Sequence, residues 1–378
     1  MATTMEVKVE NTPAVLELPE AQLHATINYY SLPTPPSLDD LSILDGTSPN
    51  IASHKVPVAD LRSLPLSSYN HSTHGFQVLH QPLAINPSHE FVHDPTILTS
   101  QYYPSIISLL KEQLHVRSTV VINSTLRDIP APDPSAPPMD YKNPRPTTGG
   151  ASLFPFSLAH SDYTPGGART HLRAMTPDWF SATGTADGCT SADERTLFLR
   201  LRDEIIDAED RAMRKAGLEP GDDYAAAAAP ADGGKKKGGY WTWDGRGYDG
   251  PRYAMFSVWR PWETVRRDPL AVLLAPAADP DGCVALPRMY RNRPGCVSEY
   301  YNENALVRPP ARGGEQVWGY ISEQKPEEVL ALKFYDSEAL RRGDGSVRLM
   351  CPHSAFTLPG TEDQPARRSC ELRVWCIW

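Results

Sequence analysis

Short, mostly hydrophobic runs dominate the second half of the sequence. Such runs place one set of side chains on each face of an extended strand, and Pro- and Gly-rich turns separate them. The pattern predicts strands over residues 253–260, 270–274, 297–301, 317–321, 329–335 and 369–377. Several short strands between turns are typical of a β-sandwich or a β-barrel.

Hydrophobic positions at helical spacing occur in the first half. Residues 100–114 are amphipathic, and residues 118–126 alternate as a strand does. Residues 190–218 carry a long apolar stripe that begins at a capping box, Ser191 with Glu194. We expect this helix to be an insertion that packs against a sheet, followed by a flexible, low-complexity loop over residues 219–239.

The amino-terminal 60 residues differ from the rest. They are rich in Pro, Ser and Asp, with one apolar piece at residues 25–32. We expect an irregular arm over residues 1–60 that packs on the body. Residues 61–378 are then expected to form a single domain, mainly β with flanking helices.

Composition and charge exclude several classes of protein. The formal net charge of −9 gives no support to a nucleic-acid partner. No signal peptide and no apolar stretch long enough to cross a membrane is evident. The six cysteines are scattered without a CxxC pair, which is typical of reduced thiols in a cytoplasmic protein.

The chemistry is concentrated at the single His-x-Asp of the sequence, His160 and Asp162. If residues 154–162 are extended, both side chains point the same way at the end of an apolar strand face. A turn signal follows at residues 164–167. Downstream of His171 one histidine remains, His353. Two imidazoles and a carboxylate form the facial triad of non-haem Fe(II) oxygenases, which leaves positions open for a co-substrate and O2.

The usual co-substrate, 2-oxoglutarate, chelates iron through its keto-acid end, and its far carboxylate requires a cation. Arginine suits this role because its guanidinium binds a carboxylate bidentately. Arg367 and Ser369 are two residues apart, so on a strand they share a face and could bind this carboxylate together. Arg373 lies on the same face and is the alternative.

A second metal motif offers another interpretation. Residues 89–93 read His-Glu-x-x-His, the zinc metallopeptidase signature with His89, Glu90 and His93. Pro87 and Pro95 bracket it closely, which opposes the sustained helix that this motif needs. A third interpretation is a catalytically inactive β-barrel binding protein that holds no metal. Two other histidines, His71 and His74, lie in a polar turn and are expected to be solvated.

Several segments in consistent order resemble a fungal family. It groups AsaB-type hydroxylase/desaturases with gibberellin A4 desaturase-like and cephem-methoxylase P8-chain-like proteins. The segments that carry the resemblance include INYYSLP (27–33), AHSDYTPGGARTHLR (159–173), FSVWRPW (256–262), YNENALVRP (301–309) and VWGYISEQKPEEVLALKFYDS (317–337).

The resemblance implies a double-stranded β-helix core (a jelly roll, cupin-like) that uses Fe(II), 2-oxoglutarate and O2. His160, Asp162 and His353 match the family's metal positions, and Arg367 with Ser369 matches its oxoglutarate motif. No catalytic residue beyond the metal centre is implied. Two features depart from the family: the long His160–His353 separation, and Ser257 where Asn is usual.

The expected reaction is oxidation of an unactivated C–H bond of a small secondary metabolite, by hydroxylation, desaturation or oxidative ring closure. The candidate substrate residues are Tyr163, Arg169, Trp259 and Arg260. Arg260 could hold a substrate carboxylate, which would favour an amino acid or another small acid. The sequence gives no prediction of oligomeric state.

Overall fold

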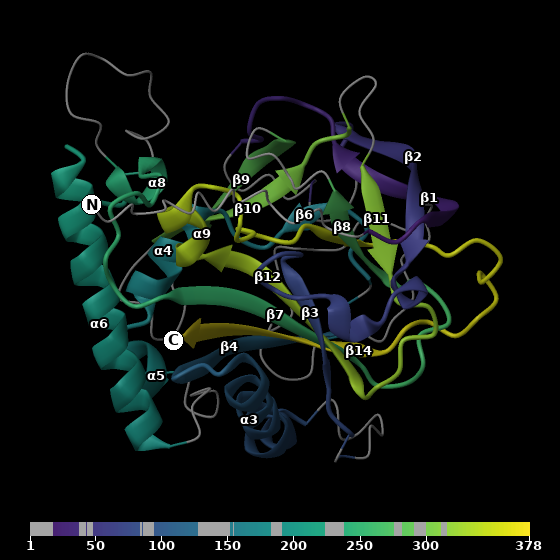
Figure 1. The fold of residues 1–378 in the computed structure, drawn as a ribbon, viewed down its shortest axis with the longest axis horizontal. Coiled ribbons are helices and arrows are strands. Elements are labelled where there is room, and N and C mark those ends of the chain that lie inside the picture. The colour runs from purple at the N-terminus through teal and green to yellow at the C-terminus, as the bar shows by residue number, and fades with distance from the viewer. Residues whose placement is uncertain are drawn as a thin grey trace, which may run out of the picture.

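Two β-sheets face each other and form the body of the protein (Figure 1). This computed structural model describes residues 18–37, 43, 48–83, 85, 94–127, 152–153, 155–182, 191–223, 238–275, 282–290, 300–310 and 316–378. Among these residues, the larger sheet has eight strands and the smaller has six. With helices on the outside, the arrangement is the jelly roll that the sequence predicts, mainly β with flanking helices.

The larger sheet has the order β1-β2-β11-β8-β13-β6-β10-β9. Its strands are β1 (Ala21–Tyr30), β2 (Ile51–Asp60), β6 (His160–Ser161), β8 (Leu270–Ala275), β9 (Cys283–Tyr290), β10 (Tyr300–Val307), β11 (Val317–Tyr320) and β13 (His353–Ala355).

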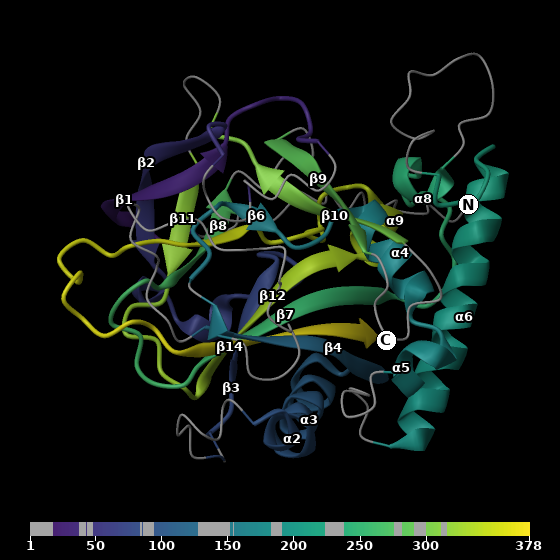
Figure 2. The same ribbon diagram turned by 180° about the vertical axis from the view of Figure 1, so that it is seen from behind.

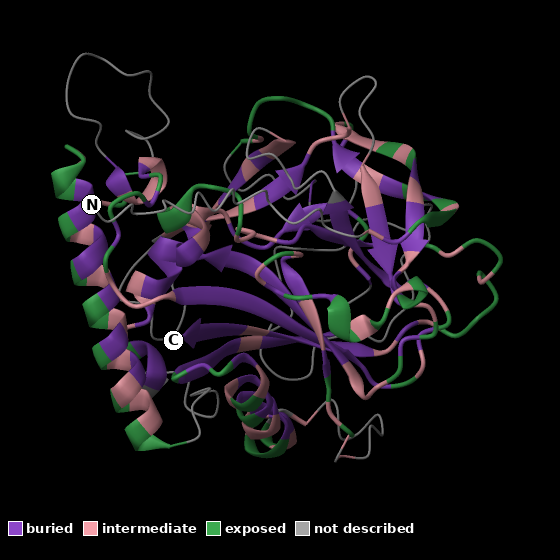
Figure 3. Cartoon of the chain, viewed as in Figure 1, coloured by how far each residue is buried: buried purple, intermediate pink, exposed green. Residues whose placement is uncertain are grey.

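The smaller sheet has the order β3-β12-β7-β14-β4-β5. Its strands are β3 (Phe76–His80), β4 (Ser118–Arg127), β5 (Ser152–Leu153), β7 (Tyr253–Pro261), β12 (Glu328–Asp336) and β14 (Ser369–Ile377). Strands β7 and β14 lie in the middle of this sheet and are buried along almost their whole length (Figure 3).

The amino-terminal segment differs from the irregular arm that was expected. Strands β1 and β2 pair antiparallel, and β2 then pairs parallel with β11. Tyr29 and Trp318 pack together, with the Trp318 indole N–H donating to the Tyr29 hydroxyl over 2.8 Å. The segment therefore forms one edge of the larger sheet. Residues 23–29 of β1 alternate between apolar and polar side chains, and the apolar Ala25, Ile27 and Tyr29 are buried.

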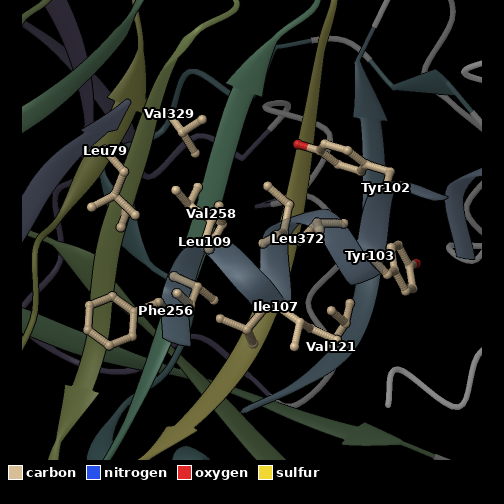
Figure 4. Close-up of a cluster of buried hydrophobic side chains, with 14 of the residues drawn as sticks. Leu79, Tyr102, Tyr103, Ile107, Leu109, Val121, Phe256, Val258, Val329 and Leu372 are labelled. Carbon is tan, nitrogen blue, oxygen red and sulfur yellow. The ribbon is translucent and has the colours of Figure 1, made fainter. Parts of the chain in front are cut away.

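Helix α3 (Tyr103–Leu114) covers the outer face of the smaller sheet. A short α2 (Pro95–Ile97) and a π-helical turn, η4 (Leu98–Tyr102), lead into it. Ile107 and Leu109 of α3 pack on Val121, Phe256 and other side chains of the sheet (Figure 4). This amphipathic helix and the strand that follows it, β4, lie where the sequence predicts them.

Helix α6 (Ala192–Lys215) stands against the ends of the strands of the smaller sheet, with α5 (Pro177–Ala182) beside it (Figure 2). Helix α4 (Pro165–Ala174) packs against β10 of the larger sheet and against α8 (Gly239–Thr242). A last helix, α9 (Ser337–Arg342), follows β12. The predicted cap is present, since the Ser191 hydroxyl accepts from the backbone N–H of Glu194. Residues 224–237, most of the loop expected over 219–239, lie outside the described residues.

No helix within the described residues combines the length and the apolar character that crossing a membrane would require.

Candidate active site

Strand β6 places His160 beside His353, the two histidines of the triad predicted from the sequence. In the larger sheet β6 lies between β13 and β10, and His160 pairs directly with His353 of β13. Their ring centroids are 4.4 Å apart. Asp162 follows on the same face, with Oδ1 3.3 Å from His160 Nε2. One potential ligand atom from each of the three residues lies within 4.8 Å of the others, and all three residues are buried.

Backbone carbonyls fix which ring nitrogen of each histidine is available. His160 Nδ1 donates to the carbonyl of Leu158 over 2.7 Å, and His353 Nδ1 faces the carbonyl of Cys351 at 3.3 Å. A carbonyl can only accept, so Nδ1 carries the proton and the lone pair remains on Nε2. This is the arrangement found around metal-binding imidazoles.

Arg373 of β14 holds the carboxylate of the triad. Its Nε donates to Asp162 Oδ2 over 2.6 Å, and its Nη1 donates to the Asn123 side chain over 3.3 Å. Asn304 also donates to the backbone carbonyl of Asp162 over 2.6 Å. One carboxylate oxygen of Asp162 is therefore used to orient the group, while Oδ1 faces the histidines.

The protonation states suit a cation. Burial by itself would raise the pKa of Asp162, but nearby positive charge, above all the guanidinium of Arg373, outweighs it and holds that pKa well below its usual range. Burial, with the neighbouring His160, lowers the pKa of His353 to about 3. An ionised carboxylate and neutral imidazoles are the forms that bind a metal ion.

A pocket opens between the two sheets beside His160 and His353. His160 and His353 line one part of it, and Arg367 lines another. Arg367 is 4% exposed and stacks 5.1 Å from the ring centroid of Trp259. Its Nη1 donates to the backbone carbonyl of Asp268 over 2.5 Å.

Two polar atoms of residues that line this pocket, Arg367 Nε and Trp259 Nε1, are buried and have no hydrogen-bond partner among the described residues. The same holds for Oγ of Ser369, two residues after Arg367. A buried donor without a partner costs free energy, so donors of this kind are expected where a polar ligand supplies the acceptor. The structure thus brings Arg367 to the same pocket as His160 and His353, and the donor set fits both a metal ion and a carboxylate.

The candidate substrate residues Trp259 and Arg260 are consecutive on β7, so their side chains point to opposite faces of the sheet. Trp259 points between the sheets and lines the pocket. Arg260 points to the outer face of β7, where it donates to the side chain of Gln81 over 2.7 Å and lies 5.7 Å from the Tyr102 ring. Neighbouring residues on a strand face opposite ways, so only one of the two can reach the pocket.

Tyr163 and Arg169 also make contacts outside the pocket lining. The Tyr163 hydroxyl bonds His171 Nδ1 over 2.8 Å. Arg169 is fully buried and donates to the backbone carbonyls of Tyr240 and Trp243, which ties α4 to α8. The structure therefore does not bring Arg169 or Arg260 to the triad.

The segment after Asp162 is a helix start and not the turn that was expected. Thr164 caps α4, its hydroxyl accepting from the N–H of Gly167 over 3.1 Å, and Pro165 occupies the first turn. A Cβ on Gly167 would lie 2.6 Å from the Glu303 carbonyl of β10. Glycine at 167 therefore allows α4 to approach the strand that pairs with β6.

Sequence reasoning missed the role of Arg373 toward the triad. It was considered only as an alternative to Arg367 for a carboxylate ligand. The available signal was its position on the same strand face as Ser369, which directs the guanidinium between the sheets. Only the packing of β14 against β6 reveals that Asp162 is its partner.

A buried triad of two imidazoles and a carboxylate, beside a jelly-roll pocket with a buried arginine, defines a non-haem iron oxygenase of the 2-oxoglutarate-dependent class. Comparisons with known proteins agree. Residues 27–188 and 246–377 match the family model described as "Oxidoreductase/YMDC permease-like domain", and the chain belongs to that family.

Named relatives are fungal. The "Gibberellin cluster GA4 desaturase" of Gibberella fujikuroi is 28% identical, over 94% of this chain and 95% of its own length. The "Alpha-ketoglutarate-dependent dioxygenase tstK" of Talaromyces stipitatus is 24% identical, over 91% and 92%. The "Hydroxylase/desaturase asaB" of Aspergillus flavus is 37% identical, over 32% of this chain and 54% of its own length. The resemblance inferred from the sequence motifs is confirmed.

A solved structure of the iron and alpha-ketoglutarate-dependent endoperoxidase NvfI shares the fold. It aligns with a TM-score of 0.56 and 18% identity, over 96% of this chain and 99% of its own. The comparisons support neither a zinc metallopeptidase nor an inactive binding protein. His89, Glu90 and His93 lie outside the described residues.

Proposed function

We propose that His160, Asp162 and His353 hold Fe(II), and that Arg367 with Ser369 binds the far carboxylate of 2-oxoglutarate. The observation that carries the proposal is the pocket itself, which is lined by both histidines of the triad and by the arginine with its unpartnered Nε. Bound iron, with 2-oxoglutarate and O2, would supply the oxidising power needed to attack an unactivated C–H bond.

The residues of the chain have distinct tasks in this proposal. Arg373 keeps Asp162 ionised and turns one of its oxygens toward the histidines. The carbonyls of Leu158 and Cys351 keep both Nε2 atoms available as ligands. Phe156, Leu270 and Leu332 give the pocket apolar walls that restrict water.

The proposed substrate is a small secondary metabolite that approaches the triad within the same pocket. The outcome (hydroxylation, desaturation or oxidative ring closure) depends on how the substrate is held relative to the metal, because geometry differing by about an ångström changes which atom reacts. The names of the relatives, which include desaturases and hydroxylases, support this range. Trp259 is the substrate residue that we retain, since it lines the pocket.

The proposal includes a cytoplasmic location, supported by the free thiols of Cys351, Cys370 and Cys376.

An anaerobic titration with Fe(II) and 2-oxoglutarate tests the proposal. We expect the wild type to develop a visible metal-to-ligand charge-transfer band. His160→Ala should abolish the band because a ligand is lost. Arg367→Ala should require much more 2-oxoglutarate to develop it, because the far carboxylate loses its cation.

His80→Ala is the matched control, since His80 is exposed on β3, away from the pocket lining. It should titrate as the wild type does. Absence of the band in folded wild-type protein, or its persistence in His160→Ala, would contradict the proposed site.

A further inference from the structure

A third arginine lies beside the residues assigned to the co-substrate carboxylate. Arg127 is the last residue of β4, and it pairs directly with Ser369 of β14 in the antiparallel register. Directly paired residues of an antiparallel ladder project to the same face, with their Cβ atoms about 5 Å apart. Arg127 therefore projects from the neighbouring strand onto the face that carries Ser369 and Glu371.

Arg367 lies two residues before β14 begins. Arg127 and Arg367 both line the pocket that contains His160 and His353. The positive charge of Arg127 also contributes, after burial, to lowering the pKa of Arg367 to about 9. The two guanidinium groups thus repel each other in a buried pocket, and an anion between them would remove that repulsion.

The carboxylates beside this pocket already contact arginines. Asp162 pairs with Arg373 at 2.6 Å. Glu371 lies 3.4 Å from both Arg127 and Arg373, and it also accepts from the Ser257 hydroxyl at 3.1 Å. Arg367 Nε and Ser369 Oγ, in contrast, are buried without a hydrogen-bond partner among the described residues. An acceptor from a bound ligand is therefore expected on the Arg367 side of the pocket.

We propose that Arg127 supplies a second guanidinium for the far carboxylate of 2-oxoglutarate. Ser369 approaches that carboxylate from β14 and Arg367 from the residues just before it, and Arg127 approaches it from β4. The proposal rests on the proposed function and adds a binding residue to it. It also gives the pocket a means of selecting a dicarboxylic 2-oxo acid over a monocarboxylic one.

Calorimetric titration of the Mn(II)-loaded protein tests this directly, since Mn(II) replaces Fe(II) without turnover. Each preparation is titrated with 2-oxoglutarate and with 2-oxopentanoate, which keeps the chelating end but lacks the far carboxylate. Arg127→Gln should raise the Kd for 2-oxoglutarate by about 10- to 100-fold, the range expected for losing a charged hydrogen bond. It should leave the Kd for 2-oxopentanoate unchanged.

Two further variants control for charge and folding. Arg211→Gln removes one positive charge from an exposed position on α6 and should bind both ligands as the wild type does. Arg127→Lys keeps the charge but not the two-pronged geometry, and it should lie between wild type and Arg127→Gln. The lysine variant also provides a readout if the glutamine variant does not fold.

A double variant separates a direct contact from an indirect one. Removing Arg127 leaves Glu371 with less compensation, and its negative charge could repel the ligand. Arg127→Gln/Glu371→Gln removes both charges and should remain weak for 2-oxoglutarate. Recovery of wild-type affinity in the double variant, or no change in Arg127→Gln, would overturn the inference. Failure of the Mn(II)-loaded wild type to bind 2-oxoglutarate would instead overturn the proposed function, and the inference with it.

Discussion

At the scale of single residues, the Asp162 carboxylate divides its two oxygens between two tasks. Oδ2 accepts from Arg373 over 2.6 Å, and Oδ1 lies 3.3 Å from His160 Nε2. The first contact fixes the rotation of the group and keeps it ionised. The second leaves an oxygen directed at the site where a metal would contact both histidines. Arg373 is therefore a positioning residue in our proposal.

Arg373→Gln should weaken metal binding by about 10- to 100-fold, the usual cost of losing a group that orients a metal ligand. Burial would no longer be opposed by the guanidinium, so the charged form of Asp162 would be less stable. The measurement is the Kd for Mn(II), by calorimetry at neutral pH.

Arg373→Lys keeps the positive charge and should recover part of the affinity. If Arg373→Gln binds Mn(II) as tightly as the wild type, the contact with Asp162 is only structural. Arg211→Gln again serves as the surface control for a lost positive charge.

At the scale of elements, the periodic sequence pattern predicted the apolar contacts of α6 but not its buried polar contacts. The apolar stripe predicted its length and its cap, and Leu201, Ile205 and Ala208 are buried as expected. The stripe does not indicate that Glu209 is buried too. Glu209 contacts Arg173 and the Tyr253 hydroxyl, so α6 is joined to α4 and β7 by polar as well as apolar contacts.

Ile205→Ala should lower the free energy of unfolding by about 2–5 kcal/mol, because it removes a fully buried side chain between α6 and the sheet. Glu204→Ala, at an exposed position on the same helix, should change it by less than about 0.5 kcal/mol. Urea unfolding of both variants measures the difference. Equal stabilities would show that α6 does not contribute to the common core.

At the scale of the whole molecule, His71 lies where distant parts of the chain meet. The turn that contains it was expected to be solvated, yet His71 is 8% exposed. Its ring stacks on Trp378 with centroids 6.1 Å apart and meets the edge of Phe256 at 5.7 Å. Burial, with the nearby charges of Lys333 and Arg252, lowers its pKa to about 4, against a smaller opposing effect of Asp336.

The depressed pKa of His71 makes stability depend on pH. The unfolded chain takes up a proton near pH 6.5, whereas the folded protein resists it until about pH 4. The contribution of neutral His71 is therefore complete above pH 6.5 and is lost as the pH falls to 4, by up to about 1.4 kcal/mol per pH unit. The measurement is the free energy of unfolding across this range.

His71→Phe keeps an aromatic ring against Trp378 and removes the titrating group. It should flatten the dependence on pH between 6.5 and 4 relative to the wild type. An unchanged slope would mean that other groups cause the loss of stability.

The sequence by itself determined the local elements and the identity of the chemical groups. Short hydrophobic runs between turn signals predicted β7, β12 and β14, helical periodicity predicted α3 and α6, and the types and order of His160, Asp162 and His353 indicated the triad. These features depend on interactions between residues that are close together in the sequence. A short sequence pattern is therefore enough to predict them.

Only the tertiary structure decided what depends on contacts between distant segments. It paired β6 with β13, made β1 and β2 part of a sheet, and turned Trp259 inward and Arg260 outward. It also placed Arg373 on Asp162 and Arg127 beside Ser369. A strand register and a charge partner are set by which chains pack side by side, and one-residue changes in register reverse the face of every side chain. That information does not reside in any single stretch of the sequence.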